Sequence, residues 1–363
     1  MPLAAAPRCL LAAALAVLLL GLAGAPAAGA AGPARFWGVV PQHTLTQAEL
    51  LRLKRGGVDS VRVPVSWARV MGTPNTFDWS GLDGAVERTA RARIETLPFV
   101  YASPKWVARP ENTIPVRNGK QRRAWMGFLK ALARRYGPQG SFWAENPGVP
   151  RRPVRTWQIW NEPNYFYFSK RPNPGRYGQL VKISHRALSS VDPGARLVLG
   201  GMFSLPRERP PSAYAAYRFL LMMYRRHPGI ERFFEGIAIH PYTRHYKYLT
   251  PILNQVRWAV RRAGDPGVGL WLTEMGWGSQ GGPDATGFEK GRKGQVRQLK
   301  GSFKALLRHR RAWRLKRVYW FSVTDFTGEE ACNFCDSSGL FTENFGAKPA
   351  WHAFTRFGGG RPR

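Results

Sequence analysis

The most constraining feature of this sequence is a regular alternation between short apolar runs and amphipathic stretches, which extends from residue 36 to residue 322. The apolar runs are rich in β-branched and aromatic residues and are bounded by Gly, Pro, Asn or Asp, as is typical of buried parallel strands. Eight such runs occupy residues 36–40, 60–65, 96–101, 156–160, 196–200, 236–240, 270–274 and 318–322.

Apolar residues recur at helical spacing between these runs. Clear apolar faces cover residues 125–136, 177–191 and 296–307. Strands that alternate with helices predict an α/β chain that forms a single-domain (β/α)8 TIM barrel. An open doubly wound sheet is the alternative, but that fold usually carries a Gly-rich phosphate turn after its first strand. Residues 39–43 read VVPQH instead, so we do not expect a nucleotide-binding fold.

The first thirty residues resemble a secretory signal. Arg8 supplies a positive charge, residues 9–22 are apolar, and small residues with A-x-A cleavage patterns follow. An uncleaved anchor is the alternative, although the apolar run is shorter than the roughly 20 residues that a membrane span needs. We therefore expect a signal peptide at 1–30, a barrel domain at 31–357 and a disordered tail at 358–363. The mature chain should be a secreted, extracellular monomer without a transmembrane segment.

The chain is strongly basic, with 55 Lys and Arg residues against 22 Asp and Glu residues and a formal net charge of +33. Hydrophobic residues make up 44% of the chain, which excludes a disordered polycation. Nucleic-acid readers interleave basic and aromatic residues on one face; no such pattern occurs here, so we expect no nucleic-acid partner. Two interpretations remain open: a solvated surface in an Arg-preferring genome, or attraction to an anionic cell-envelope polymer or polyanionic glycan.

Two cysteines follow the predicted signal, Cys332 and Cys335, in a loop rich in Gly, Asp and Ser. A zinc site needs about four ligands, and no second Cys pair exists. A redox pair is the other alternative, but a redox C-x-x-C usually opens a helix in a thioredoxin-like unit. We therefore favour a structural disulfide that fixes the loop, and we expect no metal and no cofactor.

Two carboxylates come directly after apolar strands. Glu162 follows the fourth run in the motif WNEP, and Glu274 ends the seventh run in the motif TEMGW. A buried carboxylate is costly without a partner or a task, and active residues of a TIM barrel lie at the carboxyl ends of its strands. One such Glu could be a structural salt bridge. Two that project into one barrel mouth suit glycoside hydrolysis, in which one donates a proton and the other attacks the anomeric carbon.

The motif WNEP around Glu162 resembles the W-N-E-P motif of the clan A glycoside hydrolases, which are retaining (β/α)8 enzymes. The motif TEMGW around Glu274 is similar to their strand-7 nucleophile motif. WNEPN with the later HPY at 240–242 is most like family 39 and the secreted, cellulase-like relatives of family 5. The resemblance covers residues 35–357. Strand 3 ends in YASP at 101–104, without the His that many family 5 members place there, which weakens family 5 and leaves the clan intact.

The resemblance implies a role for each residue that matches a family motif. Glu162 would be the general acid/base and Glu274 the nucleophile. Asn161 would bind the substrate 2-hydroxyl, and Arg62, at the end of strand 2, would keep the nucleophile ionised. These roles require that the pKa of the acid lie above its ordinary value of about 4.3. A retaining enzyme also requires the two carboxyl groups to lie about 5–5.5 Å apart.

Aromatic and polar residues at other strand ends complete the expected site. The resemblance implies that His240 and Tyr242 orient the two carboxylates and that Trp320 forms the aromatic floor of the −1 subsite. Trp106 and Trp277 lie near strand ends and could stack on sugar faces, with packing as the alternative for both.

These residues together predict a secreted retaining O-glycosyl hydrolase that cleaves β-glycosidic bonds in an oligo- or polysaccharide by double displacement. The alternative is a pseudo-enzyme barrel that binds carbohydrate or the cell envelope and is held there by its basic surface. The intact set of Glu162, Glu274, Asn161 and Arg62 favours the enzyme.

Overall fold

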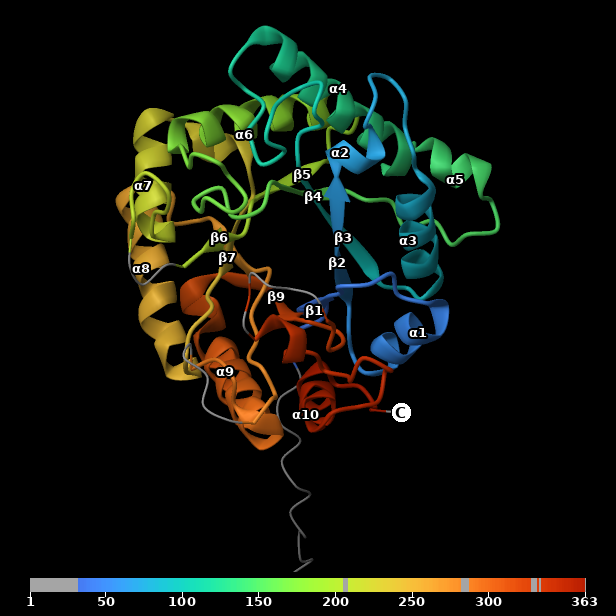
Figure 1. Cartoon of the computed structure of the whole chain (residues 1–363), viewed down its shortest axis with the longest axis vertical. Coiled ribbons are helices and arrows are strands. Elements are labelled where there is room, and N and C mark those ends of the chain that lie inside the picture. Colours follow the sequence, from blue (N-terminus) through green and yellow to red (C-terminus); the bar gives the residue numbers. More distant parts are fainter. Residues whose placement is uncertain (1–31, 205–207, 282–286, 328–331, 333, 363) are drawn as a thin grey trace, which may run out of the picture. The chain divides into compact units, whose positions relative to one another are not determined.

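Nine parallel strands in the described part of the chain form one sheet that closes on itself (Figure 1). The computed structural model describes residues 32–204, 208–281, 287–327, 332 and 334–362, so the predicted signal peptide at 1–30 lies outside the described residues. The strands are β1 (Trp37–Val40), β2 (Ser60–Ser66), β3 (Glu95–Tyr101), β4 (Thr156–Ile159), β5 (Arg196–Leu199), β6 (Met202–Phe203), β7 (Gly236–His240), β8 (Gly269–Leu272) and β9 (Leu315–Phe321).

The strand order confirms the predicted barrel. The order is β5-β4-β3-β2-β1-β9-β8-β7-β6, and a pairing between β5 and β7 closes the ring. Each of the eight predicted runs overlaps one strand, so the seventh predicted strand is β8 and the eighth is β9. The short strand β6 was not predicted. It continues the direction of β5 after Gly200 and Gly201 and pairs with β7, so β5 and β6 together take the place of the fifth strand of the barrel.

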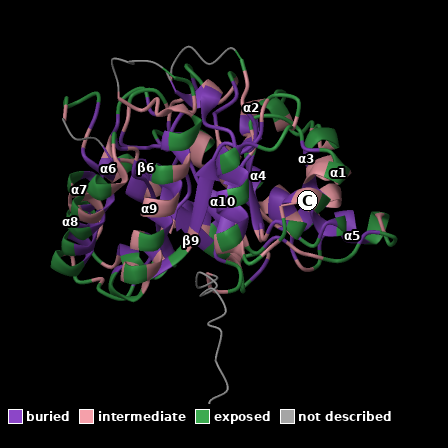
Figure 2. Cartoon of the chain, turned by 90° about the horizontal axis from the view of Figure 1, so that it is seen from below, coloured by how far each residue is buried: buried purple, intermediate pink, exposed green. Residues whose placement is uncertain are grey.

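Helices surround the barrel and follow its strands in turn (Figure 1). Figure 2 shows that buried residues concentrate on the strands and on the inner faces of the helices, as expected when each helix covers the sheet with one apolar stripe. The helices are α1 (Gln47–Arg55), α2 (Trp67–Val70), α3 (Ser80–Arg91), α4 (Gly119–Tyr136), α5 (Ser141–Glu145), α6 (Pro174–Ser189), α7 (Ala216–Arg226), α8 (Leu249–Arg262), α9 (Gly291–Trp313) and α10 (Pro349–Gly358).

The helix starts follow from local chemistry. Thr46 accepts a hydrogen bond from the Glu49 backbone and Glu49 accepts one from the Thr46 backbone, which is the capping box that begins α1. Asn118 and Asn173 cap α4 and α6 in the same way with their side-chain oxygens. The three helical faces predicted from the sequence are confirmed as α4, α6 and α9.

Alternation along β9 decides which aromatic residues face the barrel interior. Tyr319 and Phe321 pack with Val40 and Leu97 in one apolar cluster. Trp320, between them, packs instead against Phe303 of α9, with ring centroids 6.2 Å apart. Because successive strand residues point to opposite faces, Trp320 lies between the barrel and its helices.

The end of the chain differs from the predicted disordered tail at 358–363. Gly358 belongs to α10, the Arg361 backbone donates to the Arg55 oxygen at 2.8 Å, and the Trp351 ring donates to the Pro362 oxygen at 2.9 Å. These backbone contacts give residues 359–362 partners that composition alone did not suggest. The predicted disulfide is present between Cys332 and Cys335, with an S–S distance of 1.98 Å.

The described residues from position 32 onward form one compact unit. None of the helices within this described part combines the length and the apolar character that a membrane span needs.

Candidate active site

Two buried glutamates lie together at the carboxyl ends of the strands. Glu162 follows β4 and Glu274 follows β8, and they are 7% and 9% exposed. One carboxylate oxygen of each, with one ring nitrogen of His240 from the end of β7, lie within 4.8 Å of one another. The fold therefore brings together the carboxylates that the sequence singled out, although 112 residues separate them in the chain.

Backbone turns after β4 aim Glu162 into the barrel mouth. Trp160 and Glu162 have φ angles of +69° and +39°, a region that side-chain-bearing residues rarely adopt. Two hydrogen bonds hold this turn: the Glu162 backbone donates to the Gly201 oxygen at 2.9 Å, and the Trp160 ring donates to the Phe168 oxygen at 2.6 Å. Such conformations persist only where the surroundings fix them, and they cluster at functional sites.

Glu274 is surrounded by donors that favour its ionised form. Arg62 Nη1 donates to its Oε1 at 2.6 Å, and the Tyr242 hydroxyl donates to its Oε2 at 2.9 Å. Burial is the largest influence and raises the pKa of Glu274 above its ordinary value, while the charge of Arg62 and the hydrogen bonds from Tyr242 and Arg62 offset part of that rise. Arg62 is itself fully buried, so it needs this carboxylate as its counter-ion.

The pKa of Glu162 is raised further than that of Glu274. Burial raises its pKa well above the ordinary value, and the negative charge of Glu274 raises it further. Its Oε1 lies 2.8 Å from Nδ1 of His240. Burial, with the nearby charge of Arg62, lowers the pKa of His240 well below its ordinary value, so the imidazole is neutral and places no positive charge beside Glu162. Burial raises both pKa values, that of Glu162 more strongly, so Glu162 is the glutamate that keeps its proton to the higher pH.

Arg62 fixes three side chains at once. Besides Glu274, it donates from Nη2 to Asn161 Oδ1 at 2.7 Å and from Nε to Gln158 Oε1 at 2.6 Å. Its guanidinium carbon also lies 3.8 Å from the centroid of the Phe99 ring, which supports it from β3. Because Asn161 Oδ1 accepts from Arg62, the amide NH2 group is the end of this side chain that can donate to a ligand.

A chain of hydrogen bonds runs from Arg62 to Glu162 and sets the tautomer of His240. Gln158 Oε1 accepts from Arg62, so its Nε2 must donate, and Thr273 Oγ1 lies 3.3 Å from that nitrogen. The Thr273 proton then points to His240 Nε2 at 3.0 Å, which leaves the ring proton on Nδ1, facing Glu162. Gln158 and Thr273 were not among the site residues predicted from the sequence. Their signal was a polar side chain within an apolar strand, the same signal that identified the glutamates.

Gly201 makes the space that His240 occupies. A Cβ atom at Gly201 would lie 1.8 Å from His240 Nε2, closer than any real contact. The Gly200-Gly201 pair between β5 and β6 therefore allows the imidazole to lie against the backbone at this point, between Thr273 and Glu162.

The structure corrects two predicted sugar contacts. Trp320 is fully buried against α9 and its ring donates to the Ser338 oxygen at 3.0 Å, so it cannot form the floor of a subsite. Trp277 is 1% exposed, and its ring donates to the Thr243 oxygen at 2.7 Å. Both rings pack in the core, with their centroids 6.0 Å apart. Trp106 is half-buried above β3, donates to the Met71 oxygen, and stays a candidate platform.

Other aromatic side chains replace them beside the carboxylates. Tyr242 packs edge-on against Phe321 and Phe334, with centroids 6.3 and 5.5 Å away. Farther out, Phe166 and Tyr167 in the loop after Glu162 are each 48% exposed. Phe321, one position after the predicted Trp320, is thus the inward-facing aromatic residue of β9 that contacts Tyr242.

Glu162, His240 and Glu274 also have the spacing of metal ligands. Donors already occupy this cluster, however. Arg62 places a permanent positive charge 2.6 Å from Glu274, and a divalent cation bound there would face that charge. The arrangement therefore suits proton transfer and nucleophilic attack better than metal binding.

A scan of the chain against models of known protein families finds no match. A curated beta-xylosidase from Geobacillus stearothermophilus is 32% identical over 113 residues, which make up 29% of this chain and 20% of that protein. The chain thus matches only about a fifth of the length of this relative.

Solved glycoside hydrolases of families 39 and 5 resemble the whole barrel. A family 39 enzyme from the gut symbiont Bacteroides cellulosilyticus WH2 is 19% identical, with a TM-score of 0.60 over 89% of this chain and 63% of that chain. A family 39 beta-xylosidase from Caulobacter crescentus is 19% identical, with a TM-score of 0.61 over 90% and 72%. A family 5, subfamily 18 enzyme from Bifidobacterium longum in complex with Manβ1-4GlcNAc is 13% identical, with a TM-score of 0.66 over 89% and 78%. These likenesses show the shared barrel fold.

Proposed function

We propose that this chain is a retaining β-glycosidase in which Glu162 is the acid/base and Glu274 the nucleophile. The observation that carries the proposal is the asymmetric pair itself. Two buried carboxylates lie with oxygens within 4.8 Å, one bound by the Arg62 guanidinium and the Tyr242 hydroxyl and the other beside a neutral imidazole. This spacing supports direct attack by a carboxylate, since an inverting pair stands about 6.5–9.5 Å apart to admit a water.

In the first step, the Glu274 carboxylate attacks the anomeric carbon while the bond to the leaving oxygen breaks. Glu162 gives its proton to that oxygen, and the product is a glycosyl ester on Glu274 with the configuration inverted. Arg62 and Tyr242 hold the two Glu274 oxygens in place for the attack. The Asn161 amide is placed to donate to the neighbouring sugar hydroxyl.

In the second step, Glu162 acts as a base. Ester formation removes the negative charge of Glu274, which is one of the causes that raise the pKa of Glu162. The pKa of Glu162 therefore falls in the intermediate, and the ionised carboxylate can take a proton from water. The water oxygen attacks the anomeric carbon, the ester bond breaks, and the second inversion restores the original configuration.

The substrate class we propose is a β-linked oligo- or polysaccharide outside the cell, reached after removal of residues 1–30. Two of the similar proteins are named beta-xylosidases and a third was solved with a mannose-containing disaccharide. Aryl β-xylosides and β-mannosides are therefore the first substrates to test, and N-terminal sequencing of the exported protein tests the cleavage.

The anomeric form of the first product, followed by proton NMR, tests the retaining mechanism. A β-glycoside should release the β-anomer, and release of the α-anomer would contradict the proposal. Glu162→Gln should lower turnover on the order of 10²–10⁴-fold, with the smallest loss for substrates whose leaving group needs no proton. Glu274→Ala should lose activity for all substrates, and azide should restore it with formation of the α-glycosyl azide. Sugar binding without turnover in the wild-type chain would favour the binding-barrel alternative.

A further inference from the structure

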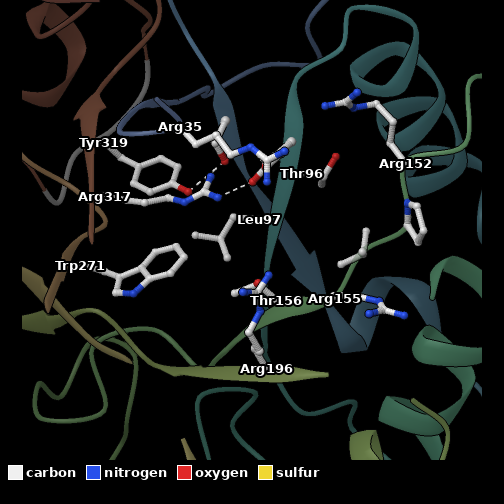
Figure 3. A pocket seen from close by; sticks show the side chains of 14 residues that line it. Arg35, Thr96, Leu97, Arg152, Arg155, Thr156, Arg196, Trp271, Arg317 and Tyr319 are labelled. Carbon is white, nitrogen blue, oxygen red and sulfur yellow. Dashed lines mark hydrogen bonds and ion pairs between the residues drawn. The ribbon is translucent and has the colours of Figure 1, made fainter. Parts of the chain in front are cut away.

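A cavity of about 190 Å³ lies at the amino-terminal end of the barrel (Figure 3). Its lining includes the first residues of several strands: Ser60 of β2, Glu95 of β3, Thr156 of β4 and Arg196 of β5. Because the strands are parallel, this end is opposite the carboxyl ends, where Glu162 and Glu274 lie. The cavity is therefore separate from the candidate active site, and the proposed function does not account for it.

Arginine dominates the lining, with side chains arranged around Leu97 and Thr156 (Figure 3). Glu95 pairs with two of these arginines, and Asp192 lies 3.7 Å from a third, Arg155. Five guanidinium groups against two carboxylates leave an excess of three positive charges. The five are Arg35, Arg152, Arg155, Arg196 and Arg317.

Two of the arginines have no acidic partner among the described residues. Arg152 and Arg196 take part in no ion pair there, and the buried Nε of Arg152 lacks any hydrogen-bond acceptor. Like charges that share a cavity repel one another, and a buried donor without an acceptor costs folding free energy. An anion in the cavity would relieve both costs.

We propose that this cavity binds a tetrahedral oxyanion such as phosphate, either free or as a group on an anionic polymer. The arginines approach from the segment before β1, from the loop before β4, and from β5 and β9. A tetrahedral anion accepts hydrogen bonds from several such directions, and guanidinium forks suit it. A planar carboxylate would be met by one or two of these forks. The Thr156 hydroxyl adds a neutral donor beside them.

Calorimetric titration with inorganic phosphate at fixed ionic strength tests the site. The wild-type chain should bind one phosphate saturably, and the double variant Arg152→Gln/Arg196→Gln should bind it at least about tenfold more weakly, as expected for loss of charge-assisted hydrogen bonds. The matched control is Arg261→Gln/Arg262→Gln, which removes the same charge from the exposed end of α8 outside the cavity. This control should change affinity less than about twofold.

A second titration with soluble polyphosphate distinguishes the two sources of the anion. Binding of inorganic phosphate assigns the cavity to the free ion, and binding of the polymer alone, lost in the cavity variant, assigns it to a polymer-borne group. An equal loss in both double variants, or no saturable binding in either titration, would overturn the proposal. Unchanged circular dichroism establishes folding, and the single variant Arg196→Gln, at an exposed position, replaces the double variant if it misfolds. Phosphate binding by Glu274→Gln should equal that of the wild type.

Discussion

Tyr242→Phe isolates one hydrogen bond to the proposed nucleophile. The change removes only the hydroxyl that donates to Glu274 Oε2 at 2.9 Å and keeps the ring that packs on Phe321 and Phe334. Burial and the charge of Glu274 raise the pKa of Tyr242 well above its ordinary value, so the wild-type hydroxyl stays protonated and donates at every assay pH. The donor stabilises ionised Glu274, and its loss must raise the pKa of that carboxyl.

The magnitude follows from the strength of such a bond. A hydrogen bond to a charged group contributes roughly 1.5–3 kcal/mol, and each 1.36 kcal/mol is tenfold in the ionised fraction. At low pH, on the acidic limb of the profile, activity follows the ionised fraction of Glu274. In this range kcat/KM of Tyr242→Phe should be about 10- to 150-fold lower than that of the wild type. On the plateau, where Glu274 is ionised in both proteins, the loss should be much smaller.

The assay is kcat/KM for an aryl β-glycoside across the full pH range. Tyr165→Phe is the matched control, because Tyr165 lies next to the Glu162 turn and forms no hydrogen bond with Glu274 in the described structure. Its acidic limb should coincide with that of the wild type. A uniform loss of activity in Tyr242→Phe, with the acidic limb unmoved, would refute the assigned role of the hydroxyl.

Three further outcomes follow from other contacts. The folded chain keeps a proton on Glu162 that the unfolded chain releases above its ordinary pKa of 4.5, so the free energy of unfolding falls as pH rises. The Tm of Glu162→Gln should therefore increase relative to that of the wild type as the pH of the thermal melts increases. A difference in Tm that does not change with pH would count against the raised pKa of Glu162. Lys348 is buried and donates to Asp325 at 2.7 Å, so Lys348→Met should lower the free energy of unfolding in urea by about 1–3 kcal/mol, whereas the exposed Lys316→Met should not. Phe166→Ala should raise KM about 2- to 10-fold for oligosaccharides, as expected for one lost aromatic contact, and leave KM for short aryl glycosides unchanged; an equal rise for both would exclude a role in binding distant sugars.

The sequence predicted the barrel well because buried parallel strands appear as isolated apolar runs. It could not predict β6, since two residues after Gly200-Gly201 carry no periodic signal of their own. The prediction that the tail is disordered missed its contacts for a related reason: hydrogen bonds such as that between Arg361 and Arg55 join residues far apart in the chain.

The same contrast holds for the candidate site, in which some residues could be predicted from the sequence and others could not. Glu162 and Glu274 could be found because a carboxylate after an apolar run is costly to bury. Trp320 was misplaced because its neighbours Tyr319 and Phe321 are also aromatic, so composition gave no sign that these two face inward and Trp320 outward. The register of β9 in the closed barrel decides that, and register is a property of the whole sheet.

The space left by the missing Cβ atom of Gly201 can help to separate active from inactive proteins among related barrels. Glu274 would be kept in a barrel that has lost turnover, because it is also the counter-ion of the buried guanidinium of Arg62. A methyl group at position 201 would displace the imidazole beside Glu162 while leaving every acidic residue in the alignment. If Glu162 acts as proposed, the glycine at position 201 should therefore discriminate working enzymes from inactive barrels better than the carboxylates do.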